Sequence, residues 1–185
     1  QLIKHAEIVP IEFIVRNIAT GSLSKRLGIA DGTILEKPLF EYCYKDDALG
    51  DPLIAKEHIF AFGWAKEEEI SQIDEMTFRI NDLLQGMFRG IGIKLVDCKI
   101  EYGKAWNKDT EEKEIVLADE ISPDTCRLWD VKTEKKLDKD RFRKDLGNII
   151  EGYQEVARRL GIMPEITNVK EVNFNKPSSI KFKKK

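Results

Sequence analysis

The residues from 96 to 103 alternate apolar and charged side chains, and this stretch is the strongest candidate for chemistry in the chain. Successive side chains of a β-strand point to opposite faces, so Asp97, Lys99 and Glu101 would stand in one row. The intervening residues would face the core: Val96, Cys98, Ile100 and Tyr102. An ordinary half-buried strand shows the same alternation, so the pattern by itself leaves a structural role open.

A second acidic position, Asp119, supports a functional interpretation of this strand. It follows the short apolar run 114–117, which could pair with 94–103 as a hairpin and bring Asp119 close to Glu101. Two neighbouring carboxylates repel each other, and one of them would be driven toward protonation. A divalent cation removes that cost, and Mg²⁺ suits one or two carboxylates together with substrate phosphates. The pair therefore predicts a magnesium site.

Other residues could bind anions. The strand predicted over 7–16 ends at Arg16, and Ser22 is interpreted as the N-cap of a short helix over 23–27 that Gly28 stops. A basic side chain, a hydroxyl and backbone N–H groups together suit an anion, although a capped helix alone explains the same residues. On the last helix, Lys139 and Arg143 lie one turn apart, which fits either an anion contact or a solvated basic face. Asp51, before Pro52, either presents a carboxylate from a loop or forms a turn.

These residues would be positioned by alternating strands and helices. Strands are predicted over 7–16, 39–44, 94–103, 114–117 and 127–130, with Pro10 at an edge or at a strand's start. Helices are predicted over 23–27, 55–63, 66–89 and from Asp138 to Leu160. The helix over 66–89 has apolar residues at three- and four-residue spacing and is predicted to pack on the core. The polar segment 104–113 is predicted to be a turn.

Composition narrows the class of protein. The chain has 185 residues, 42% of them apolar and 35% charged, with a formal net charge of −2. This favours one globular domain with a small appendage, and it gives no reason to expect nucleic-acid or membrane partners. The three cysteines are scattered, which argues against a disulfide framework or a zinc site and favours a cytoplasmic protein.

Several segments together resemble the SAICAR synthetase family, in the same order from about residue 6 to residue 162. The segments are 15–17 (Val-Arg-Asn), 21–23 (Gly-Ser-Leu), 25–28 (Lys-Arg-Leu-Gly), 96–103, 119–124 (Asp-Glu-Ile-Ser-Pro-Asp), 127–129 (Arg-Leu-Trp), 139–143 (Lys-Asp-Arg-Phe-Arg) and 156–161 (Val-Ala-Arg-Arg-Leu-Gly). The resemblance implies an α+β fold, with a mostly antiparallel sheet, flanking helices and a kinase-like, ATP-grasp-like nucleotide cleft. The family shares that cleft with an N-terminal β-rich lobe that has no counterpart here. Residues 1–8 would be the exit from that lobe, 9–163 the catalytic lobe and 164–185 a basic extension.

The resemblance also implies a reaction. Members join L-aspartate to carboxyaminoimidazole ribonucleotide (CAIR), using ATP and Mg²⁺, in de novo purine biosynthesis. It assigns Asp97 and Lys99 to catalysis and Glu101 and Asp119 to the metal and nucleotide. Its remaining assignments are Arg16, Ser22, Asp51 and Arg127 to CAIR, Ile8 to the nucleotide, and Lys139 and Arg143 to anion contacts. It implies a homodimer. A small-molecule kinase and a non-catalytic ribonucleotide-binding fragment remain alternatives.

Overall fold

The computed structural model describes residues 3–143 and 149–163. Its strands are β1 (Glu7–Ile8), β2 (Ile11–Ala19), β3 (Thr33–Tyr44), β4 (Leu53–Ile54), β5 (Ile93–Asn107), β6 (Glu112–Ala118) and β7 (Cys126–Asp130). Its helices are α1 (Gly21–Leu27), α2 (Lys56–Ala61), α3 (Glu67–Gly90), α4 (Asp140–Arg143) and α5 (Ile149–Arg159). This is the α+β fold, with a mostly antiparallel sheet and flanking helices, that was expected from the sequence.

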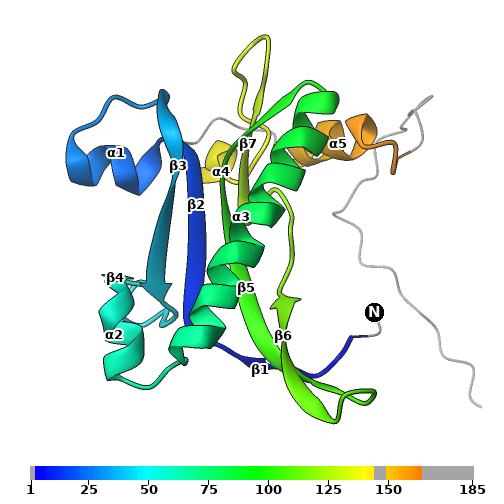
Figure 1. Cartoon of the computed structure of the whole chain (residues 1–185). Helices are drawn as coiled ribbons and strands as arrows, with labels where there is room; N and C mark the ends of the chain where they lie inside the picture. The colour runs from blue at the N-terminus through cyan, green and yellow to red at the C-terminus, as the bar shows by residue number, and fades with distance from the viewer. Residues whose placement is uncertain (1–2, 144–148, 164–185) are drawn as a thin grey trace, which may run out of the picture.

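The long strand β5 organises the sheet (Figure 1). Its first half pairs with β2 on one side and β7 on the other, and its second half pairs with β1 and β6. The sheet continues from β2 through β3 to β4, and every pair is antiparallel. Residues of β2, β5 and β7 that are far apart in sequence therefore lie directly opposite one another.

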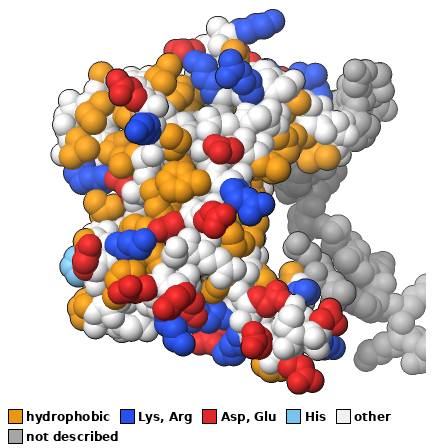
Figure 2. Space-filling model, viewed as in Figure 1, with side chains coloured by type: hydrophobic (Ala, Val, Ile, Leu, Met, Phe, Trp, Pro, Cys, Tyr) orange, Lys and Arg blue, Asp and Glu red, His pale blue; other side chains and the backbone are white. Residues whose placement is uncertain are grey.

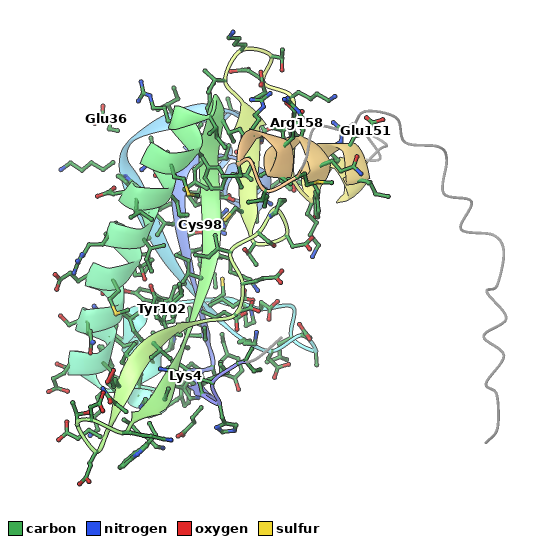
Figure 3. The ribbon with its side chains drawn as sticks, turned by 90° about the vertical axis from the view of Figure 1, so that its right-hand side faces the viewer. Lys4, Glu36, Cys98, Tyr102, Glu151 and Arg158 are labelled. Atoms are coloured by element: carbon green, nitrogen blue, oxygen red, sulfur yellow. The ribbon has the colours of Figure 1, made fainter. Side chains whose placement is uncertain are left out.

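The helix α3 covers one face of this sheet. Its buried residues recur at three- and four-residue intervals, as an amphipathic helix requires: Ile70, Ile73, Thr77, Asn81, Leu84 and Phe88. They pack in one cluster with Phe13 and Val15 of β2 and Ile100 and Tyr102 of β5. Figure 3 shows α3 running along β5, with Cys98 and Tyr102 on that strand and α5 on the other side. Burying each large side chain contributes about 1.5–3 kcal/mol.

The outer face of the molecule around α3 carries different types of side chain in its upper and lower parts (Figure 2). Apolar side chains gather in its upper part, and acidic and basic side chains crowd its lower part. In that lower region the start of α3 is fixed by charge: Glu69 accepts a hydrogen bond of 2.9 Å from the backbone N–H of Lys66 and pairs with Lys104 Nζ at 2.6 Å. Acidic residues in a first turn also favour the helix dipole.

The structure corrects several predicted bounds. The segment 104–113 is not one turn, because β5 continues to Asn107 and β6 begins at Glu112. The segment was predicted to be a turn because its side chains are polar, and they are polar because the hairpin is largely exposed to solvent. The strand predicted over 7–16 is broken at Pro10, which lacks the N–H for a ladder, and β2 starts after it. The predicted last helix contains α4 and α5, while 144–148 and the basic extension 164–185 lie outside the described residues.

Val96 does not join the main core as its alternation predicted. The pairing of β5 with β7 shifts register between Leu95 and Asp97, so the simple alternation is interrupted there. Val96 packs instead with Ile18 and Trp129 in a second small cluster. Cys98, Ile100 and Tyr102 lie in the main core as expected.

The three cysteines are free and buried. Burial raises the pKa of the Cys43 thiol to about 11 and that of Cys126 to about 12. It raises the pKa of Cys98 as well. A thiol reacts as its thiolate, so these side chains are packing groups and not nucleophiles.

Among the described helices, none has both the length and the apolar character needed to cross a bilayer.

Candidate functional site

Three charged side chains form a row across the sheet face opposite α3. Arg16 on β2 lies directly across from Asp97 on β5, and Asp97 lies directly across from Arg127 on β7. The row exists because directly opposed residues of antiparallel strands project to the same side. Core residues occupy the alternate positions of β2, so the fold that buries Phe13 and Val15 turns Arg16 to the other face.

Asp97 is the shared anion of this row. One carboxylate oxygen, Oδ2, accepts a hydrogen bond from Nη1 of Arg16 at 3.1 Å and from Nη1 of Arg127 at 2.7 Å. The side chains of Arg16 and Asp97 are only 4% and 5% exposed. Buried charges of this kind are stable only when they are paired, so the three groups hold one another in place.

Further acids extend the row at both ends. Glu41 on β3 accepts a hydrogen bond of 2.6 Å from Nε of Arg16, and its other oxygen accepts one from Arg26. At the far end, Nε of Arg127 donates to Asp140 at 3.1 Å. Burial alone would lower the pKa of Arg127, but Asp97 and Asp140 outweigh it and raise that pKa. The result is a chain of alternating charges in the order Arg26, Glu41, Arg16, Asp97, Arg127, Asp140.

The helix α1 approaches this chain closely because of Gly21. Gly21 has φ of +59°, and a Cβ placed there would lie 2.9 Å from Nη2 of Arg127. Ser22 follows it, and its Oγ accepts a hydrogen bond of 3.3 Å from Nη2 of Arg16. The prediction that Ser22 is the N-cap is wrong: Thr20 holds that position, and its hydroxyl contacts Asp31. Ser22 is instead within the helix, with its hydroxyl beside Arg16.

A second charged group lies farther along the same face of β5. Glu101 is 3% exposed, and both of its oxygens accept hydrogen bonds from Lys45 Nζ, at 2.6 and 2.7 Å. Lys99 Nζ donates to Glu12 at 2.6 Å and to Glu101 at 3.1 Å. Burial would raise the pKa of Glu101, but the two lysines lower it overall, so this carboxylate is ionised at neutral pH. Burial would lower the pKa of Lys99, but Glu12 and Glu101 raise it overall, so this amine stays protonated.

The β5–β6 hairpin places the backbone of Asp119 one residue beyond the position opposite Glu101. Glu101 pairs in register with Ala118, and Asp119 is the next residue, with a left-handed φ of 58°. The described residues contain no group of three or more side chains arranged to hold a metal. A two-carboxylate set fits Mg²⁺, which takes few protein ligands and fills its remaining positions with water and phosphate.

A cavity of about 610 Å³ collects most of these side chains. Of the predicted site residues it is lined by Arg16, Ser22, Asp51, Asp97, Lys99, Asp119, Arg127 and Lys139. Its size suits a small-molecule ligand, and its walls are charged, in contrast to the mainly apolar lining of typical pockets. Such a lining, with acidic and basic side chains together, suits a polar and charged ligand.

Comparisons with known proteins show which family the chain belongs to. The family model described as SAICAR synthetase matches residues 1–160. The chain belongs to the SAICAR synthetase family. A phosphoribosylaminoimidazole-succinocarboxamide synthase of Pelagibacter ubique is 62% identical over 184 residues, covering 100% of this chain and 70% of the relative. One of Rhizorhabdus wittichii is 60% identical, covering 91% of this chain and 65% of the relative.

Solved structures of SAICAR synthetases have the same fold. The crystal structure of the synthase from Ehrlichia chaffeensis is 50% identical with a TM-score of 0.84, covering 89% of this chain and 69% of that one. A SAICAR synthetase in complex with ADP is 45% identical with a TM-score of 0.80, covering 88% and 67%. The chain therefore spans about two thirds of the length of the relatives that it matches.

Two residues assigned from the SAICAR synthetase resemblance lie apart from the cavity lining, and the side chain of a third is not described. Glu101 does not line it but is linked to it through Lys99. Ile8 lies on β1, where it pairs with Gly103 of β5. The side chain of Arg143 is outside the part of the chain that the structure describes.

Two assigned residues also have local structural roles. Asp51 has φ of 48°, and its Oδ1 accepts a hydrogen bond of 3.0 Å from the backbone of Asp46, which makes it part of a turn as well as of the cavity wall. The backbone N–H of Lys139 donates to Pro123 at 3.0 Å, which fixes the segment leading into α4. Their predicted ligand contacts stay predictions.

Sequence reasoning missed the partners that hold the assigned residues. These are Glu12, Glu41, Lys45 and Asp140, together with Arg26, which pairs with Glu41. A signal existed for two of them, since Glu12 and Glu41 interrupt otherwise apolar strands on the face opposite the core. Asp138 is fully buried, and burial raises its pKa to about 6, although it accepts hydrogen bonds from the backbone of Leu128 and Asp140.

Proposed function

We propose that this chain carries the catalytic lobe of an ATP- and Mg²⁺-dependent ligase that joins L-aspartate to CAIR, giving SAICAR, ADP and phosphate. The observation that carries the proposal is one cavity with an arginine-rich end and a lysine–carboxylate end, in a member of the SAICAR synthetase family. A relative at 45% identity is described in complex with ADP, which supports a nucleotide as one substrate.

The arginine-rich end suits the ribose phosphate of CAIR. Arg16 and Arg127 offer guanidinium N–H donors beside the Ser22 hydroxyl, and guanidinium groups match phosphate oxygens in geometry as well as charge. Both arginines are fixed by carboxylates before the ligand arrives, so little side-chain entropy is lost on binding. This end would orient the imidazole carboxylate toward Lys99.

The reaction needs an activated carboxylate, because oxide is a poor leaving group. An oxygen of the CAIR carboxylate attacks the γ-phosphorus of ATP, the bond to ADP breaks, and an acyl phosphate forms. The aspartate amine then attacks the acyl carbon, phosphate leaves, and the amine loses a proton to give the amide. Lys99, held protonated by Glu12 and Glu101, would stabilise the negative charge on the transferred phosphoryl group. Asp97 supports the same step by holding the arginines.

Glu101 and Asp119 would hold the magnesium ion. When bound, this ion would neutralise phosphate charge. Lys45, which now covers both oxygens of Glu101, would have to share that carboxylate with the ion or move toward phosphate.

Further parts of the proposal follow from membership of the family. Residues 1–8, with Ile8 near the nucleotide, would connect to an N-terminal lobe, and the protein would be a cytoplasmic homodimer. The aspartate contacts are not assigned.

The test is a product assay on the complete natural protein that contains this sequence. With CAIR, L-aspartate and Mg-ATP, we expect ADP and the succinocarboxamide product in equal amounts. ADP formation from CAIR without aspartate, with a stable phosphorylated product, would indicate a small-molecule kinase instead. Binding of CAIR without any turnover by the folded protein would indicate a non-catalytic binding protein.

A further inference from the structure

Arg26 and Ser22 present one face of α1 to the cavity. They are four residues apart on the helix, so they lie on the same side, and both line the cavity. Lys25, the neighbour of Arg26, does not line it. The helix thus supplies a guanidinium group in addition to the hydroxyl beside Arg16.

Glu41 fixes where Arg26 lies. Glu41 is 7% exposed; one of its oxygens accepts a hydrogen bond from Arg16 Nε at 2.6 Å, and the other accepts one from Arg26 Nη2. Because Arg16 itself is anchored on β2, the shared carboxylate keeps Arg26 at the arginine-rich end of the cavity. The two arginines are therefore neighbours in space, although one lies on a helix and the other on a strand.

The two arginines differ in what they can offer a ligand. The Arg16 side chain is 4% exposed and uses Nε, Nη1 and Nη2 in contacts with Glu41, Asp97 and Ser22. The Arg26 side chain is 35% exposed, and within the described part of the chain its side-chain contact is the one from Nη2 to Glu41. A guanidinium group carries five N–H donors, so Arg26 has donors for a ligand.

The ion pairs at this end show how Arg26 could change partner. Arg16, Arg26 and Arg127 are matched by three carboxylates, those of Glu41, Asp97 and Asp140. A phosphate dianion entering this end would need N–H donors that are not already used by these carboxylates. Arg26 can turn toward it at low cost, because Glu41 would keep its contact with Arg16.

We propose that Arg26 is a third arginine contact for the phosphate of the ribonucleotide substrate, exchanging part of its pairing with Glu41 for a charge-assisted hydrogen bond to a phosphate oxygen. This inference rests on the proposed function for the identity of the substrate and adds a binding residue to it. Arg26 acts in binding, and the phosphoryl transfer takes place at the other end of the cavity.

The experiment compares Arg26→Gln with Lys25→Gln, a matched change one residue away on the same helix. Calorimetry on the complete protein measures the affinity for CAIR and for its dephosphorylated nucleoside. We expect Arg26→Gln to weaken CAIR binding about tenfold or more, as loss of a charged hydrogen bond would, and to leave nucleoside binding unchanged. In turnover, KM for CAIR rises, while KM for ATP and kcat stay within about twofold of wild type. Lys25→Gln behaves as wild type.

The outcomes separate this inference from the proposed function. Equal CAIR affinity in wild type and Arg26→Gln, or an equal loss for CAIR and nucleoside, overturns the role of Arg26 and leaves the ligase proposal standing. A folded wild-type protein that binds no CAIR overturns both. If Arg26→Gln does not fold, Arg26→Lys takes its place: it keeps the charge but loses the fork, so CAIR affinity should fall severalfold with nucleoside affinity unchanged, and no change overturns the inference.

Discussion

Replacing Asp97 with asparagine tests whether one carboxylate oxygen holds the arginine row together. The asparagine keeps the shape of the side chain and one acceptor oxygen, but it removes the negative charge shared by Arg16 and Arg127. Their contacts to Oδ2, at 3.1 and 2.7 Å, are both buried or nearly so. The substitution therefore leaves two guanidinium groups without their common counter-ion.

The magnitude follows from what each arginine retains. Removing one partner of a fully buried ion pair costs about 3–5 kcal/mol. Arg16 keeps Glu41 and Arg127 keeps Asp140, and the row borders a cavity, so we expect the lower cost of about 2 kcal/mol in the free energy of unfolding. For a protein of this size that corresponds to a fall in Tm of about 4–8 °C.

The assay is urea unfolding followed by tryptophan fluorescence, with Glu134→Gln as the control. Glu134 pairs with Lys94 at 2.9 Å, but its side chain is 68% exposed, so its loss should cost less than about 1 kcal/mol. If Asp97→Asn is no less stable than Glu134→Gln, the shared oxygen does not stabilise the row and the reasoning above is wrong. Turnover of Asp97→Asn should fall sharply, because both arginines lose their alignment.

Three further predictions use other parts of the site. Gly21→Ala should destabilise the protein by about 1 kcal/mol or more and weaken CAIR binding, because its φ is positive and its Cβ would press on Arg127. Gly28→Ala is the control, since Gly28 has a similar φ but nothing within 4 Å of its Cβ position. It should lower stability through backbone strain and leave CAIR binding unchanged. Asp119→Asn should abolish turnover and leave the melting temperature unchanged, and normal turnover would disprove its assignment to the metal. A carboxyl titration followed by NMR should place the pKa of Asp138 at about 6, against 3.8 for an ordinary aspartate. Because the folded pKa is the higher one, the folded protein binds the extra proton between about pH 4 and 6, so the stability from this group falls as the pH rises through that window; a midpoint near 4 would contradict its burial.

The sequence predicted the elements that depend on local pattern. The helix α3 was predicted over 66–89 and spans Glu67–Gly90, because its apolar repeat, acidic first turn and terminal glycines all agree. The hairpin of β5 and β6 was also predicted, because two strand-like segments lie close in sequence on either side of a polar stretch. The bounds of β3 and β5 were predicted too short because polar and exposed residues continue their pairing.

The pairing of charges could not be predicted, because it depends on register between strands distant in sequence. Arg16 and Asp97 are 81 residues apart and become direct neighbours only when β2 and β5 align. The same holds for Glu101: it was interpreted as an acid close to another acid, whereas Lys45 and Lys99 already compensate it. Local pattern identified which residues share a face, and tertiary register decided which of them touch.

The strand β5 carries Asp97 at one end of the cavity and Glu101 four residues farther along. At a rise of about 3.3 Å per residue, these two positions are about 13 Å apart, and this spacing is set by an extended backbone that is paired on both sides. In the proposed function, this strand would hold the phosphate-binding end and the place of phosphoryl transfer at a fixed separation. A substrate would then be selected by the distance between its phosphate and its carboxylate. Inserting a single residue between 97 and 101 would lengthen this separation and would also turn one of the two side chains to the opposite face of the sheet. The separation can therefore be lost in one step but cannot be adjusted gradually.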